Sequence, residues 1–271
     1  MISDLNKKCL LAFNIWDVNS AKAVIDAASK RNTNVILQTS SGIYQQMDVK
    51  ETRSFIKGYA KRKKINAYLH LDHCKDLNVI ENAILMEWDS VMIDASDLNI
   101  EENIRRTNQI IELAHHANIL VEAEVGQIKG TEDNIKIQEH SIASRNEIKR
   151  FLMETNVDMI AVAFGNAHGM YKGKPILDYN LIHFVAEISK TPFVVHGGSG
   201  MADEEIHKLS QTDNVKKINI STEVKLAYRK GILNSLKEGL LEEEEFQASR
   251  VEQSIYDAIY QMAYHKLGII I

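Results

Sequence analysis

The segment Ala67-Tyr68-Leu69-His70-Leu71-Asp72-His73 joins an apolar run to side chains that can bind a metal ion or move a proton. Two further apolar runs, residues 160–164 and 192–195, also lead to histidines, His168 and His196. Each run has the length and apolar continuity of a strand that is buried on both faces. The histidines therefore lie just past the ends of predicted strands, where imidazoles from separate strands can converge.

Strand and helix patterns alternate along the whole chain, without a linker rich in proline, serine or glycine. The predicted strands span residues 10–14, 34–38, 67–71, 90–93, 120–124, 159–163, 192–195 and 217–220. Eight strands separated by helices predict an α/β fold, a (β/α)₈ TIM barrel. We expect one domain over residues 1–271, with a helical extension at the C-terminus. A doubly wound sheet is the alternative, but no Gly-x-Gly-x-x-Gly turn follows the first strand.

Charge and composition favour a small-molecule substrate. The chain carries 32 basic and 37 acidic residues, a formal net charge of −5, so no basic excess attracts nucleic acid or anionic lipid. No apolar run has the length of a membrane span, and the first eight residues lack the apolar centre of a secretion signal. Two cysteines, Cys9 and Cys74, fit a reducing compartment. We therefore expect a cytoplasmic protein with no membrane or nucleic-acid partner.

Polar side chains follow the predicted strands where a barrel carries its chemistry, at the carboxyl ends. They are Asn14, Ser40, Asp72, His73, Asp94, Glu124, His168, His196, Asn219, Ser221 and Thr222. Three imidazoles with one coordination position left open are typical of a catalytic zinc site. The Gly-Gly-Ser-Gly segment at 197–200 follows the seventh strand, a place where barrels often bind phosphate through backbone N–H groups.

Five segments, taken together and in this order, resemble the class II, zinc-dependent ketose-bisphosphate aldolases, a family that includes fructose- and tagatose-bisphosphate enzymes. The segments are residues 69–73, 90–94, 121–126, 165–173 and 196–200, and the resemblance continues through 219–223. It implies a lyase of carbohydrate metabolism, as in glycolysis. Such an enzyme reversibly cleaves a phosphorylated ketose, such as fructose- or tagatose-1,6-bisphosphate, into dihydroxyacetone phosphate and an aldehyde.

The resemblance also implies the metal ligands. His73, His168 and His196 would hold a catalytic Zn²⁺ that stabilises the enediolate. Asp94 and Glu124 match the family's second or alternative metal position. The resemblance thus allows a second divalent ion, and a monovalent cation besides.

Two acids would move protons. Asp72 would exchange the proton of the hydroxyl whose carbon becomes the aldehyde, although a carboxylate beside a metal ligand can also serve only to orient an imidazole. By resemblance, Glu132 would move the second proton, at the three-carbon fragment. The family usually carries two glycines before this acid, whereas this chain has Lys129 and Gly130. The substrate-binding residues implied are Asn14, Ser40, Gly169, Gly197, Gly198, Ser199, Asn219, Ser221 and Thr222.

Several alternatives stay open at this point. Ser221 stands where fructose-bisphosphate enzymes commonly carry an acid. Arg250 does not align with the arginine that binds the distal phosphate in this family. The substrate could therefore be a sugar phosphate without a distal phosphate. A Schiff-base aldolase using Lys217 and a non-catalytic sugar-phosphate-binding barrel are the other function classes. The resemblance further implies a homodimer or homotetramer.

Overall fold

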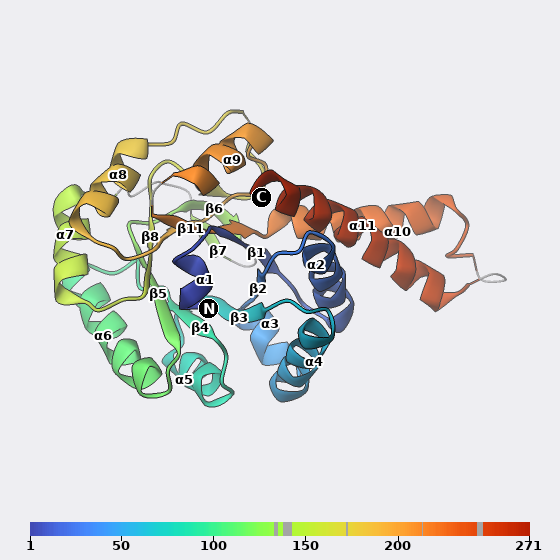
Figure 1. Cartoon of the computed structure of the whole chain (residues 1–271), viewed down its shortest axis with the longest axis horizontal. Coiled ribbons are helices and arrows are strands. Elements are labelled where there is room, and N and C mark those ends of the chain that lie inside the picture. Colours follow the sequence, from blue (N-terminus) through green and yellow to red (C-terminus); the bar gives the residue numbers. More distant parts are fainter. Residues whose placement is uncertain (133–134, 138–142, 172, 213, 243–245) are drawn as a thin grey trace.

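The computed structural model is a closed barrel of eight parallel strands surrounded by helices (Figure 1). It describes residues 1–271 except 133–134, 138–142, 172, 213 and 243–245, and it leaves out the side chains of 129, 131–132 and 135–137. The barrel strands are β1 (Leu10–Asn14), β2 (Val35–Ser40), β3 (Ala67–Cys74), β4 (Ser90–Ile93), β5 (Leu120–Val125), β8 (Met159–Val162), β10 (Phe193–Val195) and β11 (Val215–Ile220). Around the barrel they follow the order β1-β11-β10-β8-β5-β4-β3-β2. The predicted (β/α)₈ barrel is confirmed.

The helices begin where the sequence supplies local caps. Asp17 accepts a hydrogen bond from the Ser20 backbone N–H, and Ser144 forms a capping box with Glu147. The helices are α1 (Ile2–Leu5), α2 (Val18–Lys30), α3 (Ser41–Gln46), α4 (Val49–Arg62), α5 (Leu77–Leu85), α6 (Ile100–His116), α7 (Arg145–Glu154), α8 (Tyr179–Ile188), α9 (Asp203–Gln211), α10 (Thr222–Lys237) and α11 (Ala248–Ile269).

The barrel interior changes from apolar to polar along its axis. Leu10, Ile36 and Val194 pack inside the barrel with Leu5 of α1, which lies at the amino ends of the strands. Two residues further along several of the strands, side chains such as Gln38 and Glu122 are also buried but polar. The barrel interior is therefore apolar at the amino ends of the strands and polar toward their carboxyl ends. The candidate site lies at the polar end.

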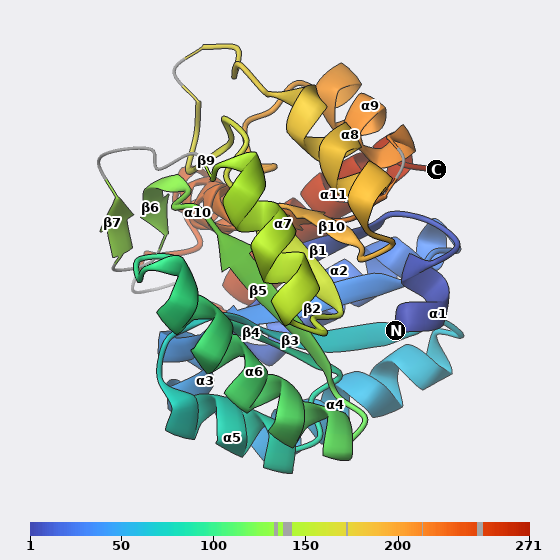
Figure 2. The same ribbon diagram turned by 90° about the vertical axis from the view of Figure 1, so that its left-hand side faces the viewer.

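A small sheet lies outside the barrel, at the end opposite α1 (Figure 2). It consists of β6 (Lys129–Glu132), β7 (Ile135–Ile137) and β9 (Ala167–His168), in the order β7-β6-β9. Gly130 pairs with His168 and has a φ of +123°, and a Cβ there would lie 2.3 Å from the His168 carbonyl oxygen. The glycine that this chain keeps before the acidic loop is thus the one the pairing requires.

Helices α10 and α11 form a hairpin that extends away from the barrel, and α11 then packs against α2 (Figure 1). The two helices of the hairpin approach closely, since a Cβ on Gly231 would lie 2.4 Å from the Cα of Ile255. The Arg31 Nε donates to the Tyr264 carbonyl, 3.0 Å away, and ties α11 to α2. No helix in the described part of the chain, the 22-residue α11 included, is both long and apolar enough to cross a bilayer.

Candidate active site

Three histidines meet at the carboxyl end of the barrel. His73 comes from β3, His168 from β9, and His196 directly follows β10. One ring nitrogen from each lies within 4.8 Å of the others, and the ring centroids are 4.5–5.8 Å apart. The structure therefore brings together residues that lie up to 123 positions apart in the sequence.

A β-bulge brings His73 to this cluster. In a regular strand, Asp72 and His73 would point to opposite faces. The register between β3 and β4 shifts between Leu71 and Cys74, and His73 has a left-handed φ of +44°. The bulge turns its imidazole toward His196, on the side of the sheet where Asp72 also lies.

Carboxylates hold two of the imidazoles. His73 Nδ1 donates to Asp94 Oδ2 at 2.9 Å, and His196 Nε2 donates to Glu122 Oε1 at 2.8 Å. The other two nitrogens, His73 Nε2 and His196 Nδ1, then face each other as lone pairs across 2.7 Å. Lone pairs at this separation repel unless a cation, either a proton or a metal ion, lies between them. The donor set therefore fits a divalent metal ion, and three imidazoles are ligands that Zn²⁺ favours.

Burial and neighbouring charges shift the pKa values of the imidazoles and carboxylates at this site. Burial lowers the pKa of His196 to about 4, which favours the neutral, metal-binding form of its ring. Burial works to raise the pKa of Asp94, but the hydrogen bond and charge of His73 outweigh it and hold that pKa well below its usual range. Burial and the nearby Asp94 charge raise the pKa of Glu124 to about 7.

Asp94 and Glu124 lie outside the cluster of three ligand atoms. Among the described residues, the set whose ligand atoms lie together consists of His73, His168 and His196. Asp94 already accepts from His73 and from Ser96 Oγ at 2.7 Å. Glu124 Oε1 accepts from the Ile128 backbone N–H at 3.3 Å. Their role as a second metal position stays a prediction.

Asp72 is buried and held by two amides. Gln38 Nε2 donates to Oδ2 at 2.9 Å, and Asn219 Nδ2 donates to Oδ1 at 3.3 Å. Gln38 Nε2 also donates to Asn14 Oδ1 at 2.7 Å, so the predicted substrate residue Asn14 belongs to the same network. Asp94 and Glu122 accept hydrogen bonds from the imidazoles of His73 and His196. A fixed carboxylate beside the histidines is placed to exchange a proton with a bound substrate.

The two predicted phosphate-binding segments meet at the start of α10. Ser199 Oγ accepts from the backbone N–H groups of Ser221, at 3.1 Å, and Glu223, at 3.2 Å. Gly197 has a φ of +72°, and a Cβ there would lie 2.1 Å from the Ala167 carbonyl oxygen, so this turn excludes a side chain. Ser221 Oγ and Asn219 Oδ1 are buried and lack a hydrogen-bond partner among the described residues. Buried polar atoms are rarely left so, which points to a ligand here.

The other predicted residues lie in the segments at the carboxyl end of the barrel. Ser40 ends β2 and precedes α3, and Thr222 is the first residue of α10. Gly198 donates its N–H to the Asn219 carbonyl at 3.0 Å. Gly169 has a φ of +95° with open space where a Cβ would lie. Glu132 ends β6, but its side chain lies outside the described structure.

Sequence reasoning missed the polar residues inside the barrel. Gln38, Glu122 and His70 are fully buried and contact the site residues. Lys217, considered as a Schiff-base lysine, is also fully buried, and its Nζ is 2.7 Å from Glu122 Oε2. All four lie two positions before a predicted site residue on the same strand. The two-residue period of a strand was the signal that could have found them.

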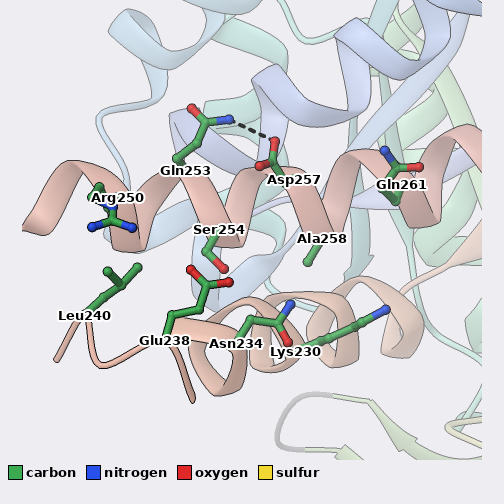
Figure 3. Close-up of a pocket in the computed structure, with 10 residues that line it drawn as sticks. All are labelled: Lys230, Asn234, Glu238, Leu240, Arg250, Gln253, Ser254, Asp257, Ala258 and Gln261. Carbon is green, nitrogen blue, oxygen red and sulfur yellow. Dashed lines mark hydrogen bonds between the residues drawn. The ribbon is translucent and has the colours of Figure 1, made fainter. Parts of the chain in front are cut away.

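Two other hollows lie away from this site. A groove of about 370 Å³ between α10 and α11 is lined by charged residues that include Lys230, Glu238, Arg250 and Asp257 (Figure 3). A second hollow of about 600 Å³ lies between α2 and α11. None of the predicted site residues lines either one.

Several proteins that are similar to this chain in sequence or structure are named as aldolases. The chain is 32% identical over 229 residues, 84% of its length, to a sulfofructosephosphate aldolase of Alkalicoccus urumqiensis, and covers 79% of that relative. The crystal structure of the YdjI aldolase from Escherichia coli K12 is similar, with a TM-score of 0.83 and 27% identity over 99% of this chain and 94% of that one. A putative fructose-1,6-bisphosphate aldolase from Coccidioides immitis has the same fold, with a TM-score of 0.86 and 23% identity over 99% of this chain and 94% of that one.

The family model described as class II fructose-bisphosphate aldolase matches residues 4–270, nearly the whole chain. The match thus includes the strands of the barrel, the three histidines of the cluster and the buried Asp72. This protein belongs to the class II fructose-bisphosphate aldolase family and is a lyase.

Proposed function

We propose that this chain is a Zn²⁺-dependent aldolase that reversibly cleaves a phosphorylated ketose into dihydroxyacetone phosphate and an aldehyde. The observation that carries the proposal is the convergence of three histidine nitrogens within 4.8 Å beside the buried carboxylate of Asp72. Membership of the aldolase family supports a small phosphorylated sugar as the substrate.

His73, His168 and His196 would hold the metal ion. When bound, a divalent cation supplies a Lewis acid that stabilises negative charge on the substrate oxygen derived from the carbonyl. The chain's own contribution is orientation, because Asp94 and Glu122 accept the ring hydrogens of His73 and His196. A second ion at Asp94 and Glu124, and a monovalent cation, remain part of the proposal.

Asp72 would take the proton from the hydroxyl whose carbon becomes the aldehyde, and would return it in the condensation direction. Gln38 and Asn219 fix its two oxygens, so the carboxylate does not have to reorient when a substrate arrives. Glu132 would move the second proton, at the dihydroxyacetone phosphate carbon. Its backbone lies in β6, which pairs with β9 and hence with His168.

The phosphate of the dihydroxyacetone half would bind where α10 begins. The N-terminus of a 16-residue helix attracts anions. The Ser221 backbone N–H donates to Ser199 Oγ, so the glycine-rich segment lies beside the start of this helix, and Ser221 Oγ lacks a partner among the described residues. An incoming phosphate would supply that partner.

A second candidate is a ketose phosphate whose distal group is not a phosphate. The relative from Alkalicoccus urumqiensis is named for a sulfofructose phosphate, which favours a sulfonate as this group. Arg250 lines the hairpin groove across from Leu240, beyond the end of α10 (Figure 3). Sixteen helical residues span about 24 Å, so Arg250 is far from the mouth of its own barrel.

Release of dihydroxyacetone phosphate from a substrate panel tests the proposal. The panel contains fructose 1,6-bisphosphate, tagatose 1,6-bisphosphate, fructose 1-phosphate and a sulfofructose phosphate. We expect release from at least one, loss of activity on chelation and recovery with Zn²⁺. Binding without release from any of them would favour a non-catalytic barrel. Covalent trapping of substrate on Lys217 by borohydride would contradict the metal-dependent route.

We also propose that the α10–α11 hairpin pairs with a second copy of the chain. Leu226, Leu233 and Leu236 of α10 are large apolar side chains with exposed fractions of 40%, 41% and 61%. The adjacent groove holds two cations and two anions, so it can face itself across a two-fold axis. Leu233→Asp should lower the mass measured by light scattering from a dimer or tetramer, whereas Leu85→Asp, on α5, should not. A monomeric wild type would contradict the pairing.

The expected single domain over residues 1–271 and the cytoplasmic location stay predictions. Because α11 packs against α2, near the other end of the sequence, we expect one cooperative thermal transition. Two separated transitions would contradict a single domain.

A further inference from the structure

A fully buried ion pair lies inside the barrel, next to the histidine cluster. Lys217 Nζ donates to Glu122 Oε2 at 2.7 Å, and His196 Nε2 donates to Glu122 Oε1 at 2.8 Å. His70 Nε2 lies 3.4 Å from Glu122 Oε2, and its Nδ1 is 2.8 Å from Ser90 Oγ. Lys217, Glu122, His70 and His196 all have exposed fractions of 0%.

This ion pair is not explained by stability. Replacing a buried ion pair with apolar residues of similar size is often neutral or stabilising, because both charges lose their hydration on burial. At the amino ends of the strands the barrel interior is filled by apolar side chains such as Leu10, Ile36 and Met159. Lys217 also falls outside the proposed reaction, since its amine is already bound to Glu122.

The pair does determine the direction of a hydrogen bond. An ammonium group can only donate, and an ionised carboxylate can only accept. With Lys217 donating to one oxygen of Glu122, the other oxygen is an acceptor for His196 Nε2. The ring hydrogen then stays on Nε2, and Nδ1 is left with a lone pair 2.7 Å from His73 Nε2.

We infer that Lys217 is a positioning residue: through Glu122 it keeps the ring hydrogen of His196 on Nε2, so that Nδ1 faces the metal site as a lone pair. The inference rests on the proposed function, because it assigns His196 Nδ1 as the metal ligand. The hydrogen position itself belongs to the metal-free protein and can be measured there.

The variant Glu122→Gln reverses the hydrogen bond. Lys217 would still donate, so the amide oxygen must turn toward Lys217 and the amide NH₂ toward His196. Nε2 must then accept, and the ring hydrogen moves to Nδ1, the nitrogen that the metal needs. Adding Lys217→Met removes the donor, so the amide oxygen can turn back to His196. The second substitution should therefore rescue the first.

Two readouts test this. Nitrogen NMR of ¹⁵N-histidine-labelled, zinc-free protein reports which nitrogen of His196 carries the hydrogen, and chelator competition gives the zinc Kd. We expect Nε2–H in the wild type, Nδ1–H and a zinc Kd raised about 10- to 100-fold in Glu122→Gln, and a return toward wild type in Lys217→Met/Glu122→Gln. Lys57→Met, which breaks the ion pair with Asp89 outside the site, should change neither readout.

Wild-type tautomer and zinc affinity in Glu122→Gln would overturn the inference, as would a double variant no better than the single one. If Glu122→Gln does not fold, two variants without buried charge at these positions replace it. Lys217→Met/Glu122→Gln should bind zinc at least tenfold more tightly than Lys217→Met/Glu122→Met, and equal affinities would overturn the inference. A wild type that binds no zinc would instead refute the proposed function. The tautomer of His196 in the zinc-free protein would still test the role of Lys217 on its own.

Discussion

Replacing Asp72 by asparagine should remove a catalytic proton acceptor while leaving the fold almost intact. In the wild type, Gln38 and Asn219 each donate to one Asp72 oxygen. The new amide oxygen can accept from Gln38, which is itself fixed by Asn14. The new NH₂ would face Asn219, whose Oδ1 lacks a partner among the described residues, so an amide rotation there restores the hydrogen bond.

The structure therefore predicts different magnitudes for stability and for catalysis. One exchanged hydrogen bond is worth about 1 kcal/mol, or a shift of about 2–4 °C in Tm. Loss of a general base lowers kcat by about 10²- to 10⁴-fold, which corresponds to about 3–5 kcal/mol in the activation free energy. Asp72→Asn should thus be folded and nearly inactive, with its zinc content unchanged.

The measurements are dihydroxyacetone phosphate release, thermal unfolding and metal content. Asp89→Asn is the matched control, since Asp89 accepts from the Leu69 backbone N–H and pairs with Lys57 just before β4, away from the site. This control should lose some stability and keep its kcat. More than a tenth of wild-type kcat in Asp72→Asn would refute Asp72 as the base. Loss of zinc in that variant would show that Asp72 belongs to the metal site instead.

Three further predictions concern the metal, the glycine turn and pH. Chelation should abolish turnover and lower Tm, and Zn²⁺ should restore both; activity that survives complete metal removal would contradict the ligand assignment. Gly197→Ala should destabilise the protein by about 1–3 kcal/mol, because a Cβ would lie 2.1 Å from the Ala167 carbonyl oxygen, whereas Gly42→Ala, with open space, should not; equal melting temperatures would contradict this. The pKa of Glu124 is raised to about 7, so the folded metal-free protein retains a proton there that the unfolded chain has lost, and this group should contribute a fall in stability on the order of 1–3 kcal/mol as pH rises from about 4.5 to 7, seen as the difference between the wild type and Glu124→Gln. Glu124→Gln should remove that fall, and parallel stability curves for variant and wild type would contradict the assignment.

The barrel was predictable because parallel strands that are buried on both faces appear in a sequence as continuous apolar runs. Residues 159–163 and 192–195 are examples, and both correspond to barrel strands in the structure. The small sheet of β6, β7 and β9 was not predicted. Its strands are short, and β9 has only two residues, so no periodic pattern marks them.

The candidate site was predictable where residues follow strand ends, and not where the backbone departs from regular geometry. Strand alternation alone would point the side chains of His73 and Asp72 to opposite faces of the sheet. The β-bulge that brings them to the same side has no local signal in the sequence. The partners of the imidazoles were also missed. The structure pairs His73 with Asp94 and His196 with Glu122, and such contacts between separate strands depend on register, which a single sequence does not show.

The most direct test of the account is X-ray absorption spectroscopy of the zinc-loaded protein, beside metal analysis of His196→Ala. We predict one zinc per chain with three imidazole nitrogens at about 2.0–2.1 Å, and loss of that zinc in the variant. A zinc bound with fewer than two imidazoles, or a stoichiometric zinc that persists in His196→Ala, would contradict it.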